Sequence, residues 1–99
     1  MRTFFLQKSD KPEKKWMIYD YENPDKVIHF GQKGYQSYPD HKNPMRKKLY
    51  KARHRKNENW TKSGIDTSGF WSVHLLWNKP SLADSIKDTE DRFDIKIIT

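Results

Sequence analysis

The segment HKNPMRKKLYKARHRK, residues 41–56, is the most strongly charged part of this 99-residue chain, and we expect the fold to be arranged around it. Nine of the twenty Lys and Arg residues lie between His41 and Lys62, against the single acid Glu58, so this segment carries a net charge of +8. Residues 1–40 carry +1 and residues 63–99 carry −2. Because the positive charge is concentrated in one helix-sized segment, we expect that segment to contact something anionic.

Residues 44–56 are predicted to form a helix. Asn43 can cap it, and Pro44 suits the first helical position, where its missing N–H is not needed. Four residues then share one narrow stripe at helical spacing: Met45, Leu49, Ala52 and the stem of Lys56. The sequence therefore predicts a helix that buries one thin seam and leaves basic groups on its other sides.

The basic side chains in and beside this helix are the candidate anion-binding residues: Lys42, Arg46, Lys47, Lys48, Lys51, Arg53, Arg55 and Lys56. Repulsion between like charges at i,i+4 spacing weakens an isolated helix by a few tenths of a kcal/mol per pair, so packing or a partner must offset it. The partner could be the phosphate backbone of a nucleic acid or an acidic protein surface. The structural alternative is a solvated surface helix with no partner.

The composition limits the class of protein. Hydrophobic and charged residues each make up 33% of the chain, so we expect one domain, residues 1–99, with a thin core in which four Trp residues bury much of the area. There is no Cys, which excludes disulfides and thiolate metal sites. Neither end of the sequence is a long apolar run, so we expect no signal peptide, no membrane span and no membrane partner.

The chain on either side of the basic helix predicts the remaining elements. Before it, alternating patterns and short turns predict an antiparallel meander of three strands, at residues 2–7, 15–21 and 26–30. After it come two predicted helices, at residues 70–77 and 81–93, and a last strand at 94–98 that could join the same sheet. We therefore predict an α+β fold, a small antiparallel sheet packed with about three helices on one side.

Two segments are predicted to be loops. Gly31 and Gly34 should end the third strand, because glycine permits positive φ or a close approach of the backbone. Residues 35–40 follow as a loop, and residues 57–69 form another.

Residues 70–77 are apolar nearly all round a helical wheel. Such a helix is buried on several sides, either within its own domain or against a partner. The candidate interface or core residues in it are Phe70, Trp71, Leu75, Leu76 and Trp77.

Aromatic residues are interleaved with the bases, as in proteins that stack on single-stranded nucleic acid. Tyr50 and Trp60 are the candidate stacking residues. For Trp60 the alternative, and the one that we favour, is a plug over the core.

The four histidines, at positions 29, 41, 54 and 74, show no HxxxH spacing, so the sequence predicts no metal site. His74 lies on the apolar segment and is expected to be a hydrogen-bonded core histidine. His54, Glu58 and Asn59 could come together as in a compact metal-dependent nuclease, but nothing else supports that grouping. The sequence contains no enzyme signature and predicts no catalytic residue, no cofactor and no small-molecule substrate.

A set of short motifs carries a resemblance to a known family: His29-Phe30-Gly31, Lys33-Gly34-Tyr35, Tyr38, His41, Arg46, Tyr50, Arg53-His54, Glu58-Asn59-Trp60, Ser63-Gly64, Gly69-Phe70-Trp71-Ser72 and Leu76-Trp77-Asn78-Lys79-Pro80. Over roughly residues 15–93 the chain resembles a family of small basic proteins of unknown function encoded by large double-stranded DNA viruses and some tailed phages. The resemblance implies a viral origin and a single domain. It supplies no activity, cofactor or catalytic residue.

These observations together predict a non-enzymatic viral structural protein, a minor capsid or capsid-associated component whose basic helix docks on an anionic partner. That partner would be a viral capsid protein or the phosphate backbone of a nucleic acid. It would be found in the virion or inside the host cell. The alternative is a free nucleic-acid-binding protein without sequence specificity, and a small metal-dependent nuclease comes third.

Overall fold

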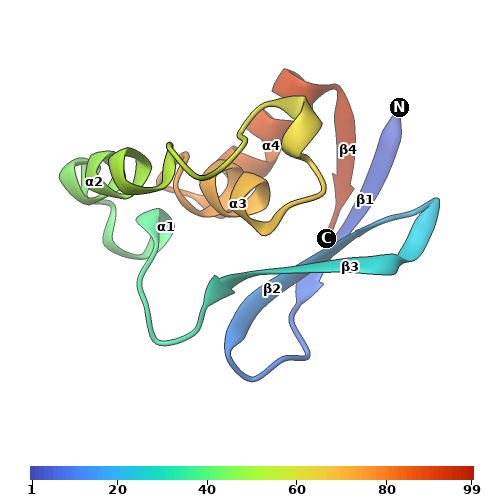
Figure 1. Ribbon diagram of the computed structural model, residues 1–99, viewed down its shortest axis with the longest axis horizontal. Helices are drawn as coiled ribbons and strands as arrows, with labels where there is room; N and C mark the ends of the chain where they lie inside the picture. The colour runs from blue at the N-terminus through green and yellow to red at the C-terminus, as the bar shows by residue number, and fades with distance from the viewer.

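A four-stranded sheet with helices on one face makes up the fold in the computed structural model, which describes residues Met1–Thr99 (Figure 1). The strands are β1 (Arg2–Lys8), β2 (Lys14–Asp20), β3 (Asn23–Gln32) and β4 (Ile95–Ile98), in the order β3-β2-β1-β4. The predicted α+β class and the three-stranded antiparallel meander are confirmed.

The C-terminal strand joins the sheet as predicted, but it runs parallel to β1, so the sheet is mixed rather than wholly antiparallel. Parallel neighbours require a long crossover, and here the whole helical layer lies between the two strands in the sequence. Asp94, with φ of 54°, turns the chain sharply after the last helix and sends it back along β1.

The helical layer contains α1 (Tyr38–His41), α2 (Pro44–His54), α3 (Ser68–Trp71) and α4 (Leu82–Phe93), with a 3₁₀ turn η1 (Lys62–Gly64) and a π-helical turn η2 (Ser72–Leu76). The predicted helix 70–77 is thus present as α3 continued by η2. No helix has both the length and the apolar character needed to cross a membrane.

The segment predicted as a loop before the basic helix is partly helical, which corrects that prediction. Asp40 accepts hydrogen bonds from the backbone N–H of Ser37 (2.8 Å) and from its hydroxyl (3.1 Å), and this capping arrangement supports α1. The same backbone bond lowers the pKa of Asp40. The second predicted loop contains the turn η1.

The core lies between the sheet and the segment α3–η2. Eleven buried residues form it: Phe4, Leu6, Ile18, Phe30, Ile65, Phe70, Trp71, Leu75, Leu76, Ile95 and Ile97. The indole N–H of Trp71 donates to the carbonyl of Ile65 at 2.8 Å, so this buried polar group is satisfied. The apolar segment 70–77 is therefore core. Because Phe70, Trp71 and Leu75 have no exposed surface, the alternative that this segment anchors a partner is wrong.

The basic helix and the adjoining cleft

Helix α2 begins where the sequence predicts. The Asn43 side-chain oxygen accepts from the backbone N–H groups of Met45 (3.0 Å) and Arg46 (3.3 Å), and Pro44 takes the first helical position. Asn43 therefore satisfies two of the N–H groups that have no partner within the helix.

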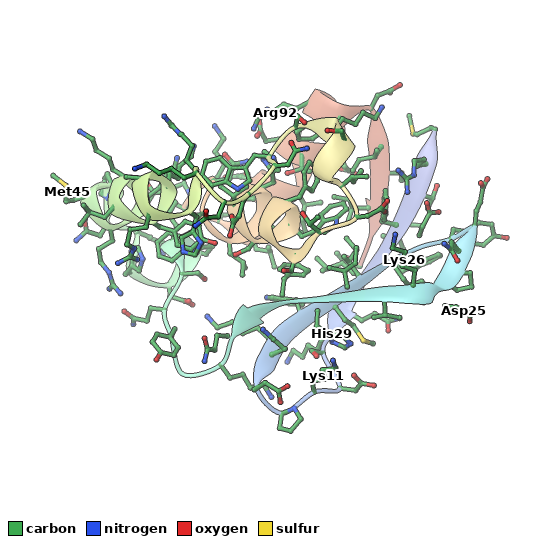
Figure 2. The ribbon with its side chains drawn as sticks, in the orientation of Figure 1. Lys11, Asp25, Lys26, His29, Met45 and Arg92 are labelled. Carbon is green, nitrogen blue, oxygen red and sulfur yellow. The ribbon has the colours of Figure 1, made fainter.

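The seam by which α2 packs is different from the predicted one. Met45 and Leu49 are 59% and 53% exposed, and Ala52 and Lys56 are exposed too. Figure 2 shows Met45 at the outer end of the helix, directed away from the sheet. The helix instead turns a neighbouring row inward, and this row consists of Lys47, Tyr50, Lys51 and His54. The Tyr50 ring packs against Trp77, and the stems of the lysines complete the contact.

Tyr50 is the centre of this contact. Its ring lies between His54, with centroids 4.1 Å apart, and Trp77, with centroids 4.2 Å apart. Its hydroxyl is 2.8 Å from the Ser72 hydroxyl, and burial raises the pKa of the Tyr50 phenol. Because both faces of the ring are covered, the prediction that Tyr50 stacks on a nucleic-acid base is wrong.

Trp60 is half-buried in the segment that follows α2. Its indole N–H donates to Glu58 at 2.9 Å, and the ammonium of Lys51 lies 5.9 Å from its ring centroid. It does not pack against the core, so the favoured prediction that it plugs the core is wrong, and it does not line the cleft described below. Its carbonyl is 2.8 Å from His74 Nε2, which confirms His74 as a hydrogen-bonded core histidine, and burial lowers the pKa of His74.

The basic residues of α2 separate into two sides. Arg46 and Arg53 line the cleft, whereas the other side forms a shallow hollow lined by Lys47, Lys48, Lys51 and Arg55. Lys42 and Lys56 lie exposed at the two ends. Lys47 is only partly available, because its ammonium donates to the Asn78 carbonyl at 2.6 Å and burial lowers its pKa.

The charges of α2 are not neutralised within the chain. None of the Lys and Arg residues between Arg46 and Lys56 has a carboxylate oxygen within 4.0 Å, whereas Arg2, Lys15, Lys26 and Arg92 all do. Concentrated and unpaired cationic charge of this kind attracts anionic partners.

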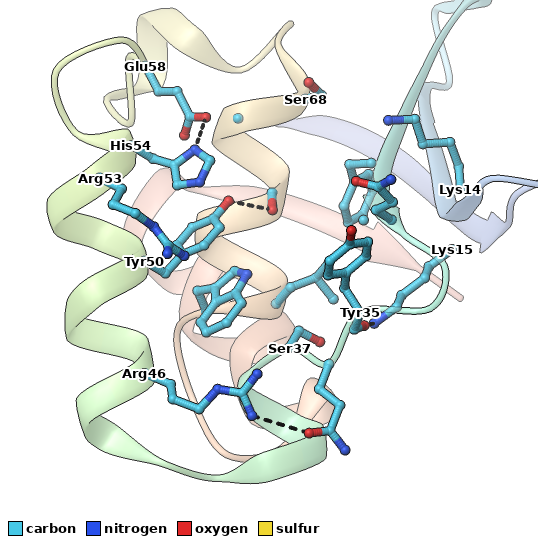
Figure 3. A pocket seen from close by; sticks show the side chains of 18 of the residues that line it. Lys14, Lys15, Tyr35, Ser37, Arg46, Tyr50, Arg53, His54, Glu58 and Ser68 are labelled. Carbon is cyan, nitrogen blue, oxygen red and sulfur yellow. Dashed lines mark hydrogen bonds and ion pairs between the residues drawn. The ribbon is translucent and has the colours of Figure 1, made fainter.

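A cleft of about 520 Å³ lies between α2, the ends of β2 and β3, and α3 (Figure 3). Its floor includes Phe30, Leu76 and Trp77, and cationic side chains reach it from both walls: Lys14, Lys15, Arg46 and Arg53. Glu58 is the one acidic residue in the lining. The contribution of Lys14 and Lys15 could not be predicted from the sequence, because residues on β2 reach α2 only through the tertiary fold.

The candidate nuclease grouping is brought together only in part. His54 Nδ1 lies 2.9 Å from Glu58 Oε2 at the edge of the cleft (Figure 3). Asn59 faces elsewhere, with its side chain bonded to Ser63 and Thr61. No three His, Cys, Asp or Glu side chains lie close enough together to hold a metal ion.

A partly exposed apolar row crosses the face of the sheet that the helices leave open. The strand register places Val27, Tyr19, Phe5 and Ile98 side by side across all four strands. Tyr21 extends this row, with its ring centroid 6.0 Å from that of Phe5 and 66% of its surface exposed. His29 lies on the same face, where Figure 2 shows it below β3, and its Nδ1 is 2.8 Å from the Ser9 hydroxyl. The sequence analysis did not identify this surface.

The fold and the two surfaces define a small α+β protein with an unneutralised basic helix on its helical side and an apolar row on its open sheet. The chain belongs to a family of unknown function (DUF5754), which matches residues 5–54. No curated protein and no solved structure matches the chain.

Proposed function

We propose that this chain is a non-enzymatic structural component of a virus particle, a minor capsid or capsid-associated protein that connects two partners. The observation that carries the proposal is the pairing of two unlike surfaces on opposite sides of a very small protein. The bases of α2 lack carboxylate partners, and the sheet carries an uncovered apolar row. A protein that links neighbours in an assembly needs two such surfaces.

The composition of α2 favours an acidic protein surface as its partner. Met45 and Leu49 are exposed one turn apart among the basic residues. A partner that presents carboxylates around an apolar patch would pair with the charges and also cover these two side chains. A phosphate backbone would satisfy only the charges. The viral setting rests on the motif resemblance described above.

The direct test is quantitative mass spectrometry of gradient-purified particles from the source virus. A fixed copy number per particle supports the structural role. Absence from particles contradicts it. Absence together with salt-dependent binding of DNA by the free protein would instead favour the second function, a free nucleic-acid-binding protein.

Charge reversal then tests the role of α2 within the particle. The triple variant Lys48→Glu, Lys51→Glu, Arg55→Glu should prevent incorporation, because it reverses the charge of the hollow on the side of α2 away from the cleft. The matched control Lys11→Glu, Lys33→Glu, Lys87→Glu makes the same change in net charge at exposed positions away from that helix. Equal loss of incorporation in both variants would mean that net charge, rather than the α2 surface, matters.

A further inference from the structure

The cleft beside α2 has a composition that the docking surfaces do not explain. Lys14 comes from the strand side and Arg46 and Arg53 from the helix side, and all three point into the opening in Figure 3. None of them has a carboxylate oxygen within 4.0 Å. Arg46 has only a neutral partner, the side-chain oxygen of Gln36 at 3.3 Å. The cleft therefore presents three unpaired cations to whatever enters it.

Glu58 forms no ion pair with any of these cations. One of its carboxylate oxygens bonds His54 Nδ1 and the other accepts from the Trp60 indole N–H, each at 2.9 Å. The bond to Glu58 fixes the imidazole of His54 and leaves Nε2 without a partner in the chain. Nε2 is thus available for a hydrogen bond with a bound molecule.

An aromatic ring stands at the rim of the same cleft. Tyr35 is 67% exposed, although its backbone is held in place. Its carbonyl accepts a hydrogen bond from the Lys15 ammonium, and its N–H donates to the Gln32 carbonyl at 3.4 Å. A ring that is exposed and anchored in this way offers a flat surface for stacking.

Size restricts the ligand. A volume of about 520 Å³ lies within the range of small-molecule sites. A double helix cannot enter such a space, whereas one nucleotide can. The lining offers cations for a phosphate, an aromatic face for a base, and hydroxyl and imidazole groups for polar edges.

We propose that this cleft binds one nucleotide unit, a phosphate with its planar base, supplied by a single-stranded nucleic acid or by a free nucleotide. The basic side chains of the hollow on the other side of α2, Lys48, Lys51 and Arg55, take no part in this binding. The cleft shares only Leu49 with the docking surface proposed above, and the charged residues of the two sites differ, so either proposal can be wrong without the other.

The test measures binding of a fluorescein-labelled ten-residue oligothymidylate by fluorescence anisotropy in low salt, using the full chain. The cleft variant Arg46→Gln, Arg53→Gln is compared with Lys48→Gln, Arg55→Gln, which removes the same charge from the same helix outside the cleft. We expect the cleft variant to weaken binding about tenfold or more and the control to weaken it far less. Equal losses would overturn the proposal, because they would indicate a diffuse electrostatic attraction.

A second matched pair tests the stacking. Tyr35→Ala should weaken binding by about fivefold or more, on the basis of the usual contribution of one stacked base. Tyr21→Ala is the control, because Tyr21 is equally exposed but lies on the open sheet. Circular dichroism and thermal melting establish that each variant is folded. An unchanged affinity in folded Tyr35→Ala would overturn the assignment of a base to this cleft.

Three further probes identify the source of the nucleotide and test whether other anions bind in its place. Calorimetric binding of thymidine monophosphate, lost in Arg46→Gln, Arg53→Gln, would support a free-nucleotide site. Binding of the oligonucleotide alone with the same sensitivity would support a single strand. Poly-glutamate that binds with that sensitivity, or inorganic phosphate that binds as tightly as the nucleotide, would overturn the proposal.

Discussion

The ring of Tyr50 lies flat against the indole of Trp77, with 4.2 Å between the centroids and 6° between the planes. This contact joins α2 to the end of the apolar segment, and His54 closes the opposite face of the tyrosine. The basic helix is thus attached through one aromatic stack rather than through a broad apolar face. Its position, and with it one wall of the cleft, depends on this stack.

Substitutions at Tyr50 should separate the contribution of the aromatic stack to stability from that of the hydrogen bond between the Tyr50 and Ser72 hydroxyls. Tyr50→Phe keeps the ring but leaves Ser72 unpaired, and should lower the free energy of unfolding by about 1 kcal/mol. Tyr50→Ala removes the ring and should cost about 3–5 kcal/mol. Urea denaturation measures both. A Tyr50→Ala cost below that of Tyr50→Phe would contradict the anchoring role.

Because the Met45–Leu49 stripe of α2 is exposed, Leu49 should contribute much less to stability than the core residue Leu75. Leu49→Ala should change the free energy of unfolding by no more than about 0.5 kcal/mol, because Leu49 is 53% exposed. Leu75→Ala should cost about 2–5 kcal/mol, because Leu75 is fully buried in the core. Thermal melts of the two variants provide the comparison. Similar costs would indicate that α2 packs by the stripe predicted from the sequence.

Gly31, near the end of β3, and Gly34, just after it, should respond unequally to substitution by alanine. Both have positive φ, 77° at Gly31 and 89° at Gly34, so alanine at either position carries a strain of about 1–2 kcal/mol. A Cβ at Gly31 would also lie 2.8 Å from Leu76 Cδ1, whereas one at Gly34 would meet nothing. Gly31→Ala should therefore destabilise the protein more than Gly34→Ala in urea denaturation. Equal penalties would mean that Leu76 moves aside freely.

His74 predicts a loss of stability in mild acid. Burial lowers its pKa from 6.5, so the folded state holds it neutral while the unfolded chain takes up a proton below about that pH. Stability should fall as the pH drops through 6.5 and level off below the folded-state pKa. His74→Gln should flatten this part of the profile in urea titrations at successive pH values. His41, whose pKa is also lowered by burial, contributes in the same direction, so His41→Gln is the comparison.

The sequence was a good guide to the local structure. The strands of the meander, the Asn43 cap, the place of the apolar helix and the core position of His74 all follow from periodicity and capping chemistry acting within a few residues. These signals are local, so a single sequence contains them.

Tertiary relationships were much harder to predict. The seam of α2 was assigned to Met45 and Leu49 because they repeat at helical spacing, and only the position of Trp77 makes Tyr50 the buried residue. The cleft requires β2 and α2 to face one another, and the apolar row requires the register of four strands. The parallel direction of β4 depends on where α4 ends, which the alternation of residues 94–98 does not specify.

The pairing of Arg2 with Ile95 has a consequence for how this protein folds. The sheet is complete only when nearly the whole chain has been brought back on itself, and such non-local pairing slows folding. The segment that matches the family, residues 5–54, supplies Leu6, Ile18 and Phe30 to the core but none of the α3–η2 or β4 side chains. Expressed alone, that segment should remain unfolded, because it holds only part of the core of one cooperative unit.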